Sequence, residues 1–111
     1  GMPGTLHLER SDTVQRLLDA AVERELLVGA ICAAPTILGH RGLLRGRKAT
    51  CFPGCEQELY EAILSDEPVV KDGQFLTARG PGVSVEFGLA LAALLAGETR
   101  AQQIRRAMQC P

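Results

Sequence analysis

An uninterrupted apolar run, Leu26–Ile31, limits the fold of this chain more than any other feature of its sequence. A half-exposed strand would alternate polar and apolar residues, whereas this run has no polar alternation and only the length of a strand. Such a run is typical of a parallel sheet that is covered on both faces. Because helix-like segments flank it, the sequence predicts an α/β fold with a mainly parallel sheet.

The elements on either side follow from helix periodicity and from turn residues. Apolar residues spaced three and four positions apart after Ser11 predict an amphipathic helix with Ser11 or Asp12 as its N-cap. Asp72-Gly73 is a hairpin turn, and Gly97 ends a helix. We expect a loop over residues 1–10, helices over 11–25, from 33–35 to 39, 55–64, 85–96 and 98–109, strands over 26–31 and 48–52, and a β-hairpin over 69–77.

The length and net charge of the chain limit the number of domains and the classes of partner that we expect. The 111 residues predict a single domain, and 46% hydrophobic with 23% charged residues is ordinary for a globular protein. A net charge of -1 argues against nucleic acid or an anionic membrane as a partner. No apolar run is long enough to span a bilayer. We expect the basic cluster, Arg41, Arg45, Arg47 and Lys48, to lie in a solvated loop rather than to bind phosphate.

The four cysteines, Cys32, Cys51, Cys55 and Cys110, follow no signal-peptide pattern. We therefore expect a reduced, cytoplasmic protein without a disulfide framework. Cys51 and Cys55 form a C-x3-C pair, but zinc needs two further ligands, and only His7 and His40 remain. The sequence predicts neither a metal site nor a cofactor.

Cys32 is the candidate reactive residue, since it follows the apolar run directly and precedes Ala33, Ala34 and Pro35. Small residues suit a sharp strand-to-helix turn, where the backbone is crowded. A thiol at the start of a helix is favoured as thiolate, because free N–H groups and the helix dipole stabilise negative charge. The alternative is a buried core cysteine, since free cysteine is among the most buried residue types. The spacing alone leaves both interpretations open.

Two motifs carry a family resemblance. The run Gly29–Thr36 resembles the nucleophile elbow of the ThiJ/PfpI family, in its DJ-one-like branch. The run Asp72–Gly82 is similar to the hairpin and Arg-Gly-Pro-Gly turn of that branch, and Val85–Leu89 to the helix after it. Gly1–Gly4 resembles the end of the family's Pro-Gly-Gly loop. The resemblance implies a single partial domain, residues 1–111, of a flavodoxin-like (class I glutamine amidotransferase-like) sandwich whose amino-terminal strands are missing.

The resemblance also implies a site. Cys32 takes the place of the family's oxidisable nucleophile, and the backbone N–H groups of Gly1 and Ala33 take the oxyanion-hole positions. Phe52, Arg79, Gly80 and Pro81 fall at positions for the substrate pocket or the dimer contact. For Arg79, a solvated charge in a turn is the alternative.

Three departures from the family pattern concern proton transfer. Phe52 stands where members of this branch often carry a histidine, and a phenyl ring cannot transfer a proton. Ala33 stands where the protease-like branch has a histidine, which argues against a peptidase. The glutamate that bonds the family's cysteine lies on the missing strands and helix. We expect His7 and His40 to be surface polar residues, and Cys51 either to approach the pocket or to be an inert buried thiol.

The resemblance implies thiolate chemistry on small reactive carbonyls, of the glyoxalase or deglycase type, or a role in the oxidative-stress response. The alternative is a non-catalytic redox-sensing or chaperone-like dimer, and older usage links such sequences to thiamine-thiazole biosynthesis. We expect a small-molecule substrate, and either a homo-oligomer or a second chain that supplies the amino-terminal half. Because no proton-transfer partner is evident, we expect weak aldehyde turnover by this chain alone.

Overall fold

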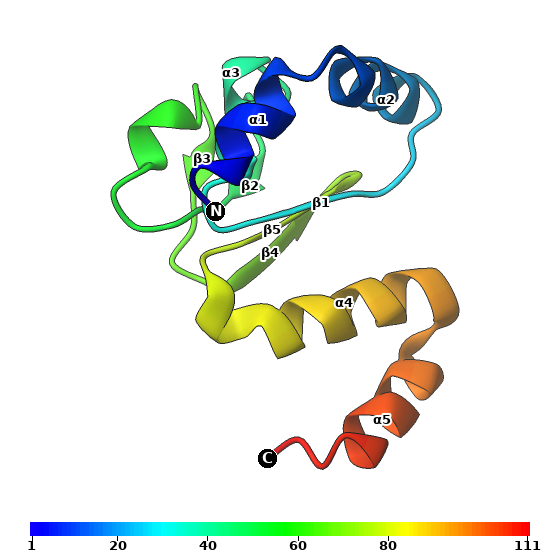
Figure 1. The fold of residues 1–111 in the computed structure, drawn as a ribbon. Coiled ribbons are helices and arrows are strands. Elements are labelled where there is room, and N and C mark those ends of the chain that lie inside the picture. The colour runs from blue at the N-terminus through cyan, green and yellow to red at the C-terminus, as the bar shows by residue number, and fades with distance from the viewer.

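The fold is built on a three-stranded sheet and a separate pair of short strands. A computed structural model describes all 111 residues (Figure 1). The strand order is β1 (Val28–Ile31), β5 (Phe75–Ala78), β4 (Val69–Asp72), with β1 parallel and β4 antiparallel to β5. β2 (Lys48–Ala49) pairs in parallel with β3 (Ile63–Leu64). The α/β class is therefore confirmed, and the larger sheet is mixed because the β4–β5 hairpin adds one antiparallel pairing.

Helices lie on both sides of this sheet (Figure 1). One side carries α1 (Gly4–Arg10), α2 (Asp12–Glu23) and α3 (Pro35–His40); the other carries α4 (Ser84–Ala96), with α5 (Glu98–Ala107) packed against α4. Two short 3₁₀ helices, η1 (Glu56–Glu58) and η2 (Pro81–Val83), follow β2 and β5. None of the helices is both long and apolar enough to cross a bilayer.

The predicted loop over residues 1–10 is wrong, because most of that segment forms α1. The helix is stabilised by contacts that its sequence does not reveal. The N–H and the hydroxyl of Thr5 both donate to the carbonyl of Gly1, at 2.8 and 3.1 Å, and Thr5 is buried. Glu9, near the other end, contacts His40 of α3. A seven-residue helix is marginal alone, so these contacts explain its formation.

The predicted helix over 55–64 is also wrong, since only η1 and β3 form there. Leu59 is buried in the core and ends the 3₁₀ turn. Ile63 then donates its N–H to the carbonyl of Arg47 at 2.8 Å, and this pairing with β2 replaces helical hydrogen bonds. The strand predicted over 48–52 is shorter than expected, because the chain leaves β2 after Ala49.

The core lies between the sheet and the α1–α3 side. Its buried members are Ala30, Leu38, Leu44, Ala49, Cys51, Leu59 and Phe75. Gly39 allows α3 to approach η1, because a Cβ there would lie 2.2 Å from the carbonyl oxygen of Glu58. This close approach places the end of α3 directly against the end of η1.

β1 and α4 are only partly buried by the rest of the chain. β1 is a terminal strand of the sheet, paired on one edge only, and Ala30 is its one buried residue. α4 is apolar along most of its length, yet no residue of it is buried. Cover on both faces, which the apolar run predicts, is therefore only partial within these 111 residues.

Candidate active site around Cys32

Cys32 occupies a strained turn at the end of β1. Its φ is +67°, in the left-handed region that costs about 1–2 kcal/mol for a residue with a Cβ. Its N–H donates to the carbonyl of Ala78 at 2.9 Å, and its carbonyl accepts from the N–H of Phe52 at 2.8 Å. The turn is thus held from β5 on one side and from the segment after β2 on the other. Such strain is typical of nucleophile elbows.

The helix after this turn begins at Pro35, the late end of the predicted range. Ala33 and Ala34 therefore belong to the turn, and Ala33 is buried. A helix dipole acts over little more than its first turn, and α3 has only six residues. Cys32 lies three residues before α3, so the contribution of this short helix to a negative charge at Cys32 is small.

Gly1 lies beside the sulfur, as the family resemblance implies. A Cβ built on Gly1 would be 4.0 Å from Sγ of Cys32. The two hydrogen bonds from Thr5 to the Gly1 carbonyl tie this residue to the first turn of α1. The structure thus brings Gly1 and Cys32 together, and the role of the Gly1 and Ala33 N–H groups toward an oxyanion stays a prediction.

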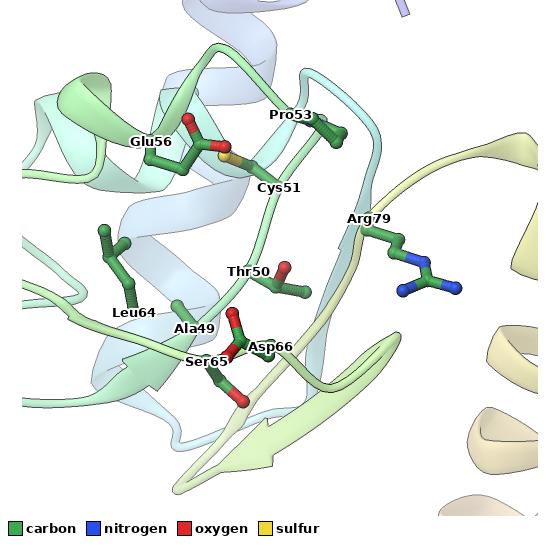
Figure 2. A pocket seen from close by; sticks show the side chains of 9 residues that line it. All are labelled: Ala49, Thr50, Cys51, Pro53, Glu56, Leu64, Ser65, Asp66 and Arg79. Carbon is green, nitrogen blue, oxygen red and sulfur yellow. The ribbon is translucent and has the colours of Figure 1, made fainter.

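The other positions implied by the resemblance are only partly brought together. The ring of Phe52 is exposed but borders Gly80, where a Cβ would lie 3.4 Å from the ring. Arg79 donates its N–H to the carbonyl of Pro68 at 3.1 Å, and Figure 2 shows its guanidinium pointing away from Cys51. Pro81 is exposed at the start of η2.

A cavity of about 250 Å³ opens beside this region, and the sequence did not predict it. Figure 2 shows its lining: Ala49, Thr50, Cys51, Pro53, Glu56, Leu64, Ser65, Asp66 and Arg79. Cys51 lines the cavity, whereas Cys32 does not. The two are connected through Phe52, whose N–H bonds to Cys32. The signal available in the sequence was the position of Cys51 immediately before Phe52.

Two ionisable groups that line the cavity, Cys51 and Glu56, have pKa values shifted in opposite directions. Burial raises the pKa of Cys51 to about 12, and the charges of Cys55, Glu56 and Cys32 act in the same direction. Its thiol donates to the carbonyl of Phe52 at 3.5 Å. The N–H of Gly54 donates to both carboxylate oxygens of Glu56, each at 3.0 Å, which lowers the pKa of Glu56. At neutral pH Cys51 is therefore a thiol and Glu56 a carboxylate.

His40, which we expected to be a surface polar residue, is partly exposed and is hydrogen-bonded on both ring nitrogens. Its Nδ1 lies 2.6 Å from Glu9 and its Nε2 lies 2.8 Å from Glu58. These hydrogen bonds raise the pKa of His40, against a smaller opposing effect of burial. His7, by contrast, is exposed on α1. The structure groups no three His, Cys, Asp or Glu side chains in an arrangement that could hold a metal ion.

A strand, a strained cysteine and a short helix together define an α/β protein of the nucleophile-elbow class. The chain belongs to the DJ-1/PfpI family, whose model matches residues 1–94. The ThiJ/PfpI resemblance read from the motifs is thereby confirmed.

Relatives in this family match along nearly the whole chain. Protein dj-1beta of Drosophila melanogaster is 36% identical over 97% of the chain, and its crystal structure superposes with a TM-score of 0.91 over 100% of the chain and 61% of its own. Oxidized DJ-1 of Toxoplasma gondii gives a TM-score of 0.92 at 28% identity, over 98% of this chain and 60% of its own. A Caenorhabditis elegans protein named glutathione-independent glyoxalase DJR-1.2 is 32% identical over 94% of the chain and 56% of its own length.

The chain is thus shorter than the proteins it matches. It spans 59% of the fly protein and 56% of the nematode glyoxalase. The residues described here form part of the DJ-1-like fold.

Proposed function

We propose that Cys32 is a nucleophile that acts on small reactive carbonyls, with chemistry of the glyoxalase type. The observation that carries this proposal is the strained elbow, which presents the cysteine next to Gly1. The nematode relative named as a glutathione-independent glyoxalase supports the same class of substrate.

The proposed chemistry begins with addition of the Cys32 thiolate to the aldehyde carbon of a 2-oxoaldehyde such as methylglyoxal. The carbonyl oxygen becomes an alkoxide, which the N–H groups of Gly1 and Ala33 would stabilise. A base must then move the proton from the first carbon to the second, giving an enzyme thioester of a 2-hydroxy acid. Water releases the acid and restores the thiol, so that aldehyde plus water gives 2-hydroxy acid.

The proton transfer between the two carbons is the step for which this chain offers no evident general acid or base. Phe52 stands at the expected histidine position, and Cys51 is protonated because its pKa is about 12. Loss of a general acid or base typically lowers a rate by about 10²–10⁴-fold. We therefore expect addition at Cys32 but slow turnover by these 111 residues.

The test follows methylglyoxal consumption, lactate release and reversible protection of each thiol from alkylation. Methylglyoxal should protect Cys32 most, with little lactate formed, and Cys32→Ser should abolish any lactate formation. Cys110→Ser is the matched control, because Cys110 lies beyond α5, and it should behave as the parent chain. Equal protection of all four thiols would contradict the proposal that Cys32 is the nucleophile. Rapid lactate formation that is lost in Cys32→Ser would show that the chain contains a general base that we have not identified.

A second candidate is a redox sensor, and the missing proton-transfer group favours it. A thiolate at Cys32 would attack hydrogen peroxide to give sulfenic acid and hydroxide, and a second peroxide would oxidise the sulfenic acid to sulfinic acid with release of water. The oxidized Toxoplasma relative supports oxidation within the family. The two functions differ in stoichiometry: without a reductant, each Cys32 should consume one or two peroxides on the way to sulfinic acid, whereas a glyoxalase should convert many aldehydes per thiol.

A further inference from the structure

His40 connects two carboxylates from different elements. It ends α3, its Nδ1 lies 2.6 Å from Glu9 of α1, and its Nε2 lies 2.8 Å from Glu58 of η1. A neutral imidazole has one N–H donor, whereas an imidazolium has two. With both carboxylates ionised, both hydrogen bonds form only when the ring is protonated.

No other charged side chain competes for this ring. Glu9 and Glu58 are the charged groups that act on it, from α1 and η1. Tyr60, after η1, lies with its ring 5.3 Å away at 42°. The neighbouring Arg41 turns instead to Asp19 of α2. The protonation state of His40 is therefore set mainly by the two carboxylates, which raise its pKa.

Each of the three elements that His40 joins, α1, α3 and η1, is linked to a residue of the Cys32 site by hydrogen bonds or by its position in the chain. From Glu58 a path of backbone hydrogen bonds runs back to the elbow: Glu58 N–H to Cys55 carbonyl at 2.9 Å, Cys55 N–H to Phe52 carbonyl at 3.0 Å, and Phe52 N–H to Cys32 carbonyl at 2.8 Å. From Glu9, α1 leads to Thr5, which holds Gly1 beside the sulfur. α3 itself begins three residues after Cys32.

We propose that His40 is a positioning residue whose imidazolium holds α1, α3 and η1 together, so that the reactivity of Cys32 depends on the protonation of His40. This inference rests on the proposed function, since it takes Cys32 as the reactive group. When the ring loses a proton, one of its two hydrogen bonds is lost, and either Gly1 or Phe52 is held less firmly. Reactivity then falls with rising pH, opposite to the rise that thiolate formation alone produces.

The experiment uses the two histidines of the chain. Proton NMR of the imidazole C–H groups gives both pKa values, and His7→Gln assigns the remaining signal to His40. The second-order rate constant for alkylation of Cys32 by iodoacetamide is then measured by mass spectrometry between about pH 5 and pH 9, the range in which histidine titrates. Circular dichroism confirms that each variant is folded.

We expect the parent chain to show a downward step of roughly two- to thirtyfold, the usual range for such couplings, at the pH where His40 titrates. His40→Gln should lack the step, and His7→Gln should keep it. Glu58→Gln retains a hydrogen-bond acceptor but removes a charge, so it should move the NMR pKa of His40 and the step together to lower pH. If His40→Gln does not fold, Glu58→Gln carries the test.

The outcomes separate the two proposals. A step that is absent from the parent chain, that persists in His40→Gln, or that does not follow the NMR pKa in Glu58→Gln overturns the role of His40. Lower thermal stability of His40→Gln without a change in the pH profile overturns it as well. If Cys32 reacts no faster than Cys110 at any pH, the proposed function fails instead.

Discussion

Cys32 accepts a backbone hydrogen bond from Phe52, the residue after Cys51, and we expect the two cysteines to differ strongly in reactivity. Cys51 is buried with a pKa of about 12, so almost none of it is thiolate at neutral pH. Limited iodoacetamide labelling of the native protein, read by mass spectrometry, should modify Cys32 before the other three thiols. Labelling of Cys51, Cys55 or Cys110 while Cys32 stays protected would identify Cys32 as a core residue.

His40 should also stabilise the fold in a pH-dependent way. The carboxylates of Glu9 and Glu58 raise its pKa in the folded state, while an unfolded histidine titrates near pH 6.5, about its reference value. The stabilisation is thus fully present below about pH 6.5 and is lost as pH rises through the folded pKa. The difference in melting temperature between the parent chain and His40→Gln should therefore shrink as pH rises. A difference independent of pH would show that the charge is not involved.

At the residue scale the sequence predicts what depends on near neighbours. The apolar run followed by Cys32 and two alanines predicts a strained turn, and the structure has one. The hydrogen bonds of His40 to Glu9 and Glu58 could not be predicted from the sequence, because the two glutamates lie 31 and 18 residues away along the chain. Only the packing of α1, α3 and η1 brings the three side chains together.

At the scale of elements, the contact between α3 and η1 depends on Gly39. A methyl group there would lie 2.2 Å from the carbonyl oxygen of Glu58 and 2.8 Å from Cα of Leu59, both backbone atoms. We expect Gly39→Ala to lower the free energy of unfolding by about 2–3 kcal/mol, because overpacking forces the backbone to shift. Urea unfolding measures it.

Gly88→Ala is the matched control for this prediction. Gly88 lies within α4, and a Cβ there meets nothing within 4 Å. Alanine should be favourable by about 0.5–1 kcal/mol, since glycine is a poor helix former. Equal destabilisation by the two substitutions would contradict the contact between α3 and η1.

Elements with their own stop and start signals were predicted well. Ser11 accepts from the N–H of Val14 at 3.3 Å and begins α2, and Gly73 adopts a φ of +59° in the β4–β5 turn. The predictions for residues 1–10 and 55–64 were wrong because the structure of these segments depends on contacts with other parts of the chain. α1 is stabilised by Gly1 and His40, and β3 pairs with β2. Local propensity is a weak guide where tertiary contacts decide.

At the scale of the whole molecule, one side is apolar and uncovered. α4 has no buried residue, Leu95 is 74% exposed, and an apolar groove of about 410 Å³ runs between α4 and α5. β1 has one unpaired edge, which invites pairing with another chain. We propose that a second copy or another polypeptide covers these surfaces.

Sedimentation equilibrium at micromolar concentration should accordingly show association of the 111-residue chain. Leu95→Lys should weaken association without unfolding the protein, because this side chain makes little contact within the chain. His7→Gln, on α1, is the matched surface control and should leave association unchanged. A stable monomer that unfolds cooperatively would contradict the proposal.

The left-handed backbone of Cys32 bears on how such a protein changes over generations. At φ = +67°, any side chain with a Cβ costs about 1–2 kcal/mol, whereas glycine adds only about 0.5–1 kcal/mol of chain entropy on folding. Replacement by glycine would therefore be neutral or favourable for folding. An idle thiol at this position would be open to loss by drift, and only selection on its chemistry would retain it.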